Sequence, residues 1–212
     1  MQWRLLEGIP DEWVRELLAG ARRRKFDRRE VLFHEGDPAA SLHLVDRGKV
    51  AIRVTTPLGD VAMLDVLVGG DILGEMALLA PGERRSATAI ALERTETLMV
   101  DAQRFADLRA NHPSAGELLM RLLAGRVQQL NHRLLEALYL PADTRLLRRL
   151  LWLADTYGDE IPLTQEDLAG LAGATRGTVN RVLRREEENG ALALKRGRVI
   201  VIDRAALGRR AR

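Results

Sequence analysis

The stretch PLTQEDLAGLAGATRGTVNRVLRREEENG, residues 162–190, decides the fold of the C-terminal part of the chain. Thr164 stands before two acidic residues, which is the pattern of a helix N-cap followed by a first turn that favours negative charge. Gly173 is suited to the turn after this helix, and a second helix is predicted to begin near Thr175. Two short helices joined by such a turn predict a helix-turn-helix.

The second of these helices has a polar face suited to DNA. Its inward-facing residues are predicted to be Val179, Val182 and Leu183. Its outward-facing residues are predicted to be Arg176, Gly177, Asn180 and Arg181. Arginines near the start of such a helix reach the major groove, where each can donate two hydrogen bonds to O6 and N7 of guanine. Further residues are expected to contact DNA phosphates, which position the protein without reading sequence: Thr164, Thr175, Thr178, Lys195 and Arg198.

Basic residues concentrate in the last third of the chain. The formal net charge is only +3 and the isoelectric point is about 9.8, so the location of the basic residues matters more than their sum. Residues 191–203, ALALKRGRVIVID, alternate apolar residues around a basic centre and predict a two-stranded wing with a basic tip. The other basic run, residues 22–25, is expected to be a solvated loop.

The N-terminal part has the texture of an antiparallel β structure. A short helix is predicted over residues 10–20, and short apolar runs separated by turn residues follow from about residue 29 to residue 100. Glycines recur every 11 or 12 residues, at Gly36, Gly48, Gly59 and Gly70, which is the spacing of a strand plus a tight turn. A β-roll of jelly-roll type fits this pattern.

A long amphipathic helix is predicted between the two parts. Its apolar residues alternate steps of three and four, as in a two-stranded coiled coil: Met120, Leu123, Val127, Leu130, Leu134 and Ala137. The helix therefore predicts a dimer interface, although it could instead pack on its own domain. Pro141 ends the helix and makes residues 140–143 a candidate hinge. The predicted class is α+β, with an effector-binding β-roll over residues 1–112, a dimerisation helix and hinge over 113–140, and a winged helix-turn-helix DNA-binding domain over 141–212.

The segment GDILGEMALLAPGERRSATAIA, residues 70–91, places an acidic residue and an arginine in one short cassette. A phosphate held there would accept hydrogen bonds from backbone amides, the Ser86 hydroxyl and the Arg85 guanidinium. Glu75 would then accept from sugar hydroxyls. The plainer alternative is that Glu75 and Arg85 pair with each other or with solvent.

With these two motifs, the chain resembles the CRP/FNR (catabolite activator) family over its whole length. The resemblance implies that the GE…RSA block is a cyclic AMP cassette. Gly74 would contribute its backbone, Glu75 would bind the ribose 2′-hydroxyl, and Arg85 with Ser86 would bind the cyclic phosphate. Met76 and Ala87 complete the expected pocket.

The base-binding position departs from the family pattern. Family members that use cyclic AMP contact adenine from the long helix with adjacent Thr and Ser or Thr and Asn, whereas this chain has Leu130 and Asn131. Asn131 can still hydrogen-bond a base edge, so cyclic AMP, another nucleotide and no effector all stay open.

The resemblance also implies how the operator is read. Family members use arginines at the positions of Arg176 and Arg181 with a glutamate between them, and Gly177 stands where that glutamate would be. Guanine contacts are therefore expected, with a half-site related to TGTGA but an altered preference where the cytosine acceptor is missing. A homodimer would present two recognition helices about 34 Å apart to double-stranded DNA. The family also implies contact with RNA polymerase and an effector-driven shift between two conformations.

Composition excludes several other classes. There is no cysteine, so no disulfide, iron–sulfur cluster or cysteine nucleophile is expected. The four histidines show no metal-ligand spacing, so neither a metal nor haem is expected. The chain has no nucleotide-triphosphate loop and no apolar run near about 20 residues, which argues against an enzyme and a membrane protein and favours the cytoplasm. Two alternatives stay open: an effector-independent activator of the same family, and a cyclic-nucleotide-binding regulatory module, which would need no helix-turn-helix.

Overall fold

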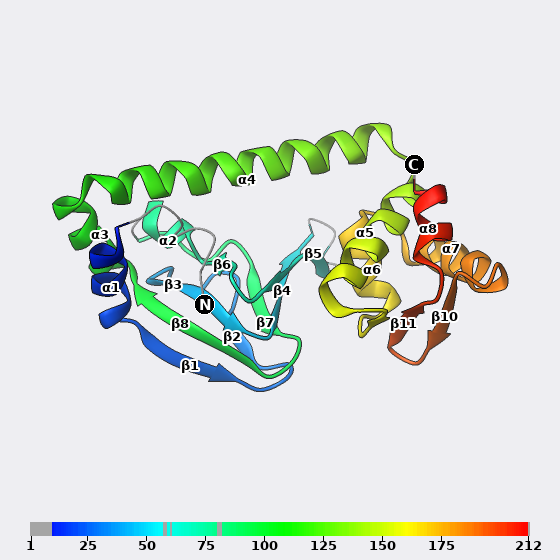
Figure 1. The fold of residues 1–212 in the computed structure, drawn as a ribbon, viewed down its shortest axis with the longest axis horizontal. Helices are drawn as coiled ribbons and strands as arrows, with labels where there is room; N and C mark the ends of the chain where they lie inside the picture. Colours follow the sequence, from blue (N-terminus) through cyan, green and yellow to red (C-terminus); the bar gives the residue numbers. More distant parts are fainter. Residues whose placement is uncertain (1–9, 57–58, 60, 80–81, 212) are drawn as a thin grey trace. The chain divides into compact units, whose positions relative to one another are not determined.

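The chain forms two units, each with its own sheet or sheets and its own core (Figure 1). The computed structural model describes residues 10–56, 59, 61–79 and 82–211. Contacts group residues 1–54 and 65–128 in the first unit and residues 55–64 and 129–212 in the second.

Two four-stranded antiparallel sheets form the β-roll, which confirms the predicted fold class. The first has the order β1-β8-β3-β6 and the second the order β2-β7-β4-β5. In chain order the strands are β1 (Arg22–Phe26), β2 (Val31–Phe33), β3 (Ser41–Arg47), β4 (Lys49–Thr55), β5 (Val61–Val68), β6 (Ile72–Leu73), β7 (Thr88–Ala91) and β8 (Thr95–Asp101).

The prediction that residues 22–25 form a solvated loop is wrong. They belong to strand β1, whose backbone pairs in register with β8 from Arg22 opposite Met99 to Phe26 opposite Thr95. The basic side chains are still exposed, and Arg23 forms ion pairs with Asp46 and Glu96. An edge strand with charged side chains discourages pairing with other chains, so the charge run is compatible with a strand.

Gly48 forms the tight connection between β3 and β4. Its φ of +89° is a left-handed conformation, and a Cβ there would lie 2.5 Å from Oγ1 of Thr95. Glycine is therefore required at position 48 by both its backbone conformation and the lack of space.

Helices close the first unit. The predicted N-terminal helix is α1 (Asp11–Ala19), and its buried Trp13 packs edge-on against Phe105 of α3 (Ala102–Asn111) with ring centroids 6.2 Å apart. The helical turn α2 (Met76–Leu79) lies within the cassette, and α4 (Pro113–Tyr139) is the predicted long helix. The core beneath these elements comprises Trp13, Leu17, Leu42, Leu44, Ile72, Leu78, Val100, Phe105 and Leu119.

The second unit contains the predicted helix-turn-helix and wing. Its elements are α5 (Ala142–Tyr157), β9 (Glu160–Ile161), α6 (Gln165–Ala172), α7 (Arg176–Glu188), β10 (Leu192–Lys195), β11 (Arg198–Val201) and α8 (Arg204–Arg210). The wing hairpin β10–β11 gains a third strand, β9, and the chain adds helix α8, neither of which was predicted. Within the described residues, every helix is too short or too polar to cross a lipid bilayer.

Candidate functional site

The cassette turns at Gly74, directly after β6. Gly74 has a φ of +78°, and a Cβ there would lie 2.5 Å from Nη1 of Arg85 and 3.0 Å from the Ser41 carbonyl oxygen. Glycine is thus required both by backbone conformation and by the close approach of Arg85. The turn brings the backbone of Gly74 against the side chain of Arg85, and the charge of the adjacent Glu75 acts on the same guanidinium.

Arg85 is the most unusual group of the cassette because its guanidinium is buried, with the residue only 7% exposed. Nη2 donates to Oγ of Ser41 at 3.1 Å, Nη1 donates to the Gly74 carbonyl oxygen at 3.4 Å, and the guanidinium carbon lies 4.1 Å from the ring centroid of Phe33. Its buried Nε has no hydrogen-bond partner among the described residues. Burial lowers the pKa of Arg85 from its ordinary value, while the charges of Asp37 and Glu75 act in the opposite direction.

A cation buried this way is stabilised by an anion that approaches it, because an unpaired buried charge is costly. An anionic oxygen also supplies the acceptor that Nε lacks. The residues present therefore fit a phosphate group.

The guanidinium forms part of the wall of a cavity of about 280 Å³ inside the β-roll. His43 lies in the same wall, buried, with Nδ1 3.0 Å from Oγ1 of Thr97. Burial, and then the positive charges of Arg85 and Arg24, lower the pKa of His43 from 6.5 to about 4. His43 is therefore neutral at physiological pH and adds no second positive charge beside Arg85.

Glu75 forms its ion pair with Arg126 and not with Arg85, so the partner is a residue that the sequence analysis missed. Arg126 of α4 donates from Nε to Oε1 of Glu75 at 3.1 Å and from Nη2 to the Ile72 carbonyl oxygen at 3.4 Å. The sequence offered one signal for Arg126. It precedes by one helical turn Leu130, which stands at the position of the family's base contact. Arg126 orients the carboxylate that is predicted to bind ribose.

The remaining predicted pocket residues have less defined surroundings. Ser86 is exposed directly after Arg85, Met76 is half exposed at the start of α2, and Ala87 is half-buried. Asn131 is exposed on the part of α4 that belongs to the second unit, so its contact with an effector stays a prediction.

Helix α4 exposes the apolar stripe predicted as a dimer interface. Met120, Val127, Leu130 and Leu134 are each more than half exposed, and Leu123 is half-buried. The stripe is wider than predicted near the end of the helix, where the further exposed apolar side chains are Leu135, Leu138 and Tyr139. So much exposed apolar surface on one helix marks an interaction site.

The helix-turn-helix is defined by local caps. Thr164 caps α6 through a reciprocal capping box, with Asp167 N–H donating to Oγ1 of Thr164 and Thr164 N–H donating to Oδ2 of Asp167. Gly173 ends the helix in the left-handed conformation with a φ of +57°. Thr175 then caps α7, its Oγ1 accepting from Thr178 N–H at 3.1 Å. The helix starts predicted from the sequence are therefore confirmed.

Helix α7 presents the predicted polar face. Val179, Val182 and Leu183 are buried, and the exposed residues are Arg176, Gly177, Asn180 and Arg181. A residue that the sequence analysis did not single out, Glu186, is fully buried on the same helix and pairs with Arg185 and with Arg210 of α8. The ion pair between Glu186 and Arg210 attaches α8 to α7.

The wing and the start of α6 enclose a second cavity. Lys195 and Arg198 are opposite one another across the two-residue turn of the hairpin, and Gly197 in that turn has a φ of +72°. A cavity of about 430 Å³ is lined by Thr164, Arg176, Lys195, Arg196 and Arg198, among others. The side chain of Arg198 also pairs with Glu160 of β9. This cavity thus brings together one predicted base-reading residue, Arg176, and three predicted phosphate-contacting residues, which are Thr164, Lys195 and Arg198.

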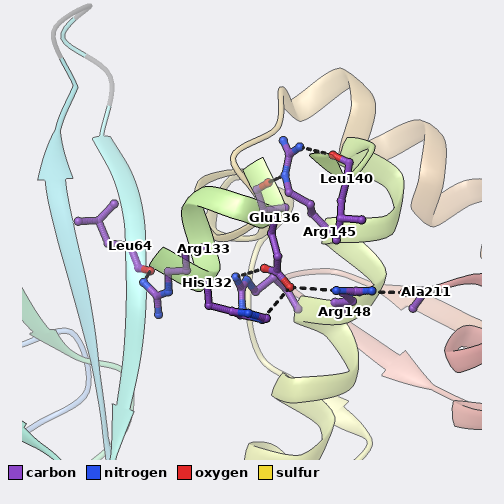
Figure 2. Close-up of polar contacts among 10 residues, drawn as sticks. Leu64, His132, Arg133, Glu136, Leu140, Arg145, Arg148 and Ala211 are labelled. Carbon is purple, nitrogen blue, oxygen red and sulfur yellow. Dashed lines mark hydrogen bonds and ion pairs between the residues drawn. The ribbon is translucent and has the colours of Figure 1, made fainter. Parts of the chain in front are cut away.

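Several arginines of the basic last third bind protein groups near the predicted hinge (Figure 2). Glu136 of α4 has a buried carboxylate that accepts from Nη2 of Arg149 at 2.7 Å and from Nη1 of Arg148 at 3.4 Å. Arg145 donates to the carbonyl oxygens of Leu140, Ala172 and Gly173, at 2.7 to 2.8 Å, so it joins the end of α4 to the turn of the helix-turn-helix. These arginines therefore bind groups of the protein around residues 136–143, where the hinge is predicted.

Among the described residues, no group of three or more histidine, aspartate or glutamate side chains is arranged to hold a metal ion.

Comparison with known proteins matches both parts of the chain. Residues 23–112 match the cyclic nucleotide-binding domain family, and residues 144–210 match the Crp-like helix-turn-helix domain family. The CRP-like cAMP-activated global transcriptional regulator of Mycobacterium tuberculosis is 31% identical over 217 residues, covering 98% of this chain and 96% of that protein. The cyclic AMP receptor protein of Thermus thermophilus is 34% identical over 204 residues, covering 96% of this chain and 94% of that protein.

A solved structure agrees with these relatives. The catabolite activator protein of Thermus thermophilus covers 98% of this chain and 97% of its own, with 33% identity and a TM-score of 0.57. These matches define a DNA-binding transcription regulator with a cyclic nucleotide-binding domain, and not an enzyme. The chain belongs to the CRP/FNR family.

Proposed function

We propose that this transcription regulator is a homodimer controlled allosterically by cyclic AMP and directed to a pseudo-palindromic operator. Effector bound at the cassette shifts the population toward a conformation in which both recognition helices enter the major groove, about 34 Å apart. A cytoplasmic location and contact with RNA polymerase belong to the same proposal.

The buried guanidinium of Arg85 is the observation that carries the effector proposal. It lies in the cassette with an Nε that lacks a partner among the described residues, which is the arrangement an incoming cyclic phosphate would complete. Glu75, oriented by Arg126, supplies the acceptor for a ribose hydroxyl. The names of the relatives, a cAMP-activated regulator and a cyclic AMP receptor, favour adenosine as the nucleoside.

The exposed stripe of α4 supports the dimer. Met120, Val127, Leu130 and Leu134 occupy the a and d positions of a coiled coil and are more than half exposed in the single chain. A second copy of the same helix would bury them by two-fold symmetry.

Calorimetric titration of cyclic AMP tests the effector, with Arg85→Ala as the variant and Arg84→Ala as its matched control. Arg84 is the exposed neighbour, and its side chain donates to the Gly36 carbonyl oxygen. Loss of the charge-assisted hydrogen bonds should weaken cyclic AMP binding about a hundredfold in Arg85→Ala, while Arg84→Ala binds as the wild type does. Equal affinity in all three proteins would show that the pocket is misassigned.

Sedimentation tests the dimer with Leu134→Asp and with Gln128→Asp as the control. Both side chains are exposed in the single chain, so neither change disturbs the folded monomer, but only Leu134 lies on the apolar stripe. Leu134→Asp should be monomeric at concentrations where Gln128→Asp is dimeric. A dimeric Leu134→Asp protein would contradict the proposed interface.

One observation favours an effector-independent activator as the second candidate. Leu130, an apolar side chain, stands where family members that use cyclic AMP contact the purine. Gel shifts on duplexes selected from a random pool, with and without cyclic AMP, separate the two candidates. Equal DNA affinity in both conditions would support effector-independent binding and contradict allosteric control.

A further inference from the structure

One of the two predicted base-reading arginines is held by a carboxylate that lies next to the hinge. Asp143 is the second residue of α5 and follows Pro141 by two residues. Its Oδ1 accepts from Nη2 of Arg181 at 3.1 Å and its Oδ2 from Nη1 of the same side chain at 3.4 Å. Oδ2 also accepts from Nη1 of Arg185 at 3.0 Å.

The position of Asp143 favours this contact. It lies in the first turn of α5, where the helix dipole stabilises a carboxylate, and its side chain is 27% exposed. The Arg181 side chain is 63% exposed, so it can also leave the carboxylate. An ion pair at such a site is weak enough to be exchanged for a DNA contact.

The contact occupies the atoms that reading a base requires. Both terminal nitrogens of Arg181 point at Asp143, and these are the donors that an arginine offers end-on to O6 and N7 of guanine. In contrast, Arg176 has no ion-pair partner within the described part of the chain. The two arginines of the recognition helix are therefore not equally ready for DNA.

We propose that Asp143 competes with guanine for Arg181 and thereby sets both the affinity and the sequence discrimination of the DNA-binding domain. Each half-site must exchange the Asp143–Arg181 ion pair for the guanine contact. This inference rests on the proposed function, since it assumes that α7 enters the major groove.

Binding of Asp143→Asn to DNA tests the proposal, and Asp155→Asn is the matched control. Asp155 is an exposed carboxylate of the same helix that pairs with Arg204, so its amide variant changes the net charge equally without touching Arg181. The probe is the tightest duplex that the wild-type protein selects from a random pool, and a scrambled duplex of equal length measures non-specific binding. Circular dichroism confirms folding, with Asp143→Ala as a second variant.

Removing the competing exposed ion pair should raise the DNA affinity about threefold per half-site. For a dimer on two half-sites, the affinity should rise about tenfold. Asp143→Asn should bind the selected duplex about tenfold more tightly than the wild type and the scrambled duplex nearly unchanged, with no change for Asp155→Asn. Weaker or equal binding of the selected duplex, or an equal gain on both duplexes, would overturn the competition. Failure of the wild-type protein to select any duplex would instead contradict the proposed function.

Discussion

Acidification should destabilise the β-roll through His43. The folded state keeps this imidazole neutral because it is 4% exposed, lies near the rings of Phe26 and Phe33, and shares its cavity with Arg85. Its pKa is about 4 in the folded chain, whereas an imidazole in the unfolded chain titrates near 6.5. Between pH 4 and pH 6.5, His43 therefore binds a proton in the unfolded state but not in the folded state.

The sign and size of the effect follow from this difference. The contribution of His43 is fully present above pH 6.5, and it is lost as the pH falls from 6.5 toward 4, because the unfolded state gains a proton that the folded state rejects. Lowering the pH from 7 to 5 should reduce the free energy of unfolding by about 2 kcal/mol through this residue alone. The reduction should approach about 3 kcal/mol below pH 4.

Urea unfolding at pH 7 and pH 5 measures the effect, with His43→Asn as the variant. The asparagine amide can still hydrogen-bond Oγ1 of Thr97 but does not titrate. A Trp152→Phe background removes the tryptophan of the second unit, so that fluorescence reports on the unit that contains His43. The wild type should lose about 2 kcal/mol more than His43→Asn between the two pH values. Equal losses in the two proteins would refute the assignment of the proton to His43.

Three further substitutions test the other features. Gly74→Ala should cost about 1–2 kcal/mol of stability and weaken cyclic AMP binding, because a Cβ at a φ of +78° would lie 2.5 Å from Nη1 of Arg85; unchanged melting and calorimetry would contradict this. Arg181→Ala should weaken binding to a selected operator far more than to scrambled DNA, whereas an equal loss on both in gel shifts would make Arg181 a phosphate contact. Glu136→Gln should lower the free energy of unfolding of the second unit by about 2 kcal/mol, because the hydrogen bonds of Arg148 and Arg149 lose their ionised acceptor; thermal melts that match the wild type would show that the hinge does not depend on this carboxylate.

The C-terminal part was predicted well because its signals are local. Thr164, Gly173 and Thr175 lie within a few residues of the helix ends they define, and the structure places each at the predicted cap or turn. The burial of Val179, Val182 and Leu183 followed from helical periodicity alone. Strand β9 and helix α8 were missed because each is short and stabilised by contacts with distant residues.

The candidate pocket was predicted only in part. The cassette spacing placed Glu75 near Arg85, but the partner of Glu75 lies 51 residues away on α4. Likewise, the sequence showed that basic residues concentrate in the last third of the chain, but Arg145, Arg148 and Arg149 of this part donate to groups within the protein. A charge count cannot distinguish an arginine that faces solvent from one that ties two helices together.

The sequence by itself determined the order of the parts, the caps and turns of the helix-turn-helix, and the residue types of the cassette, because these depend on neighbours along the chain. Only the tertiary structure decided which side chains come into contact. Arg85 packs against the Phe33 ring, Arg126 pairs with Glu75, and Arg181 pairs with Asp143. Each of these pairs joins elements far apart in sequence, and its geometry depends on how strands and helices pack, which no local pattern encodes.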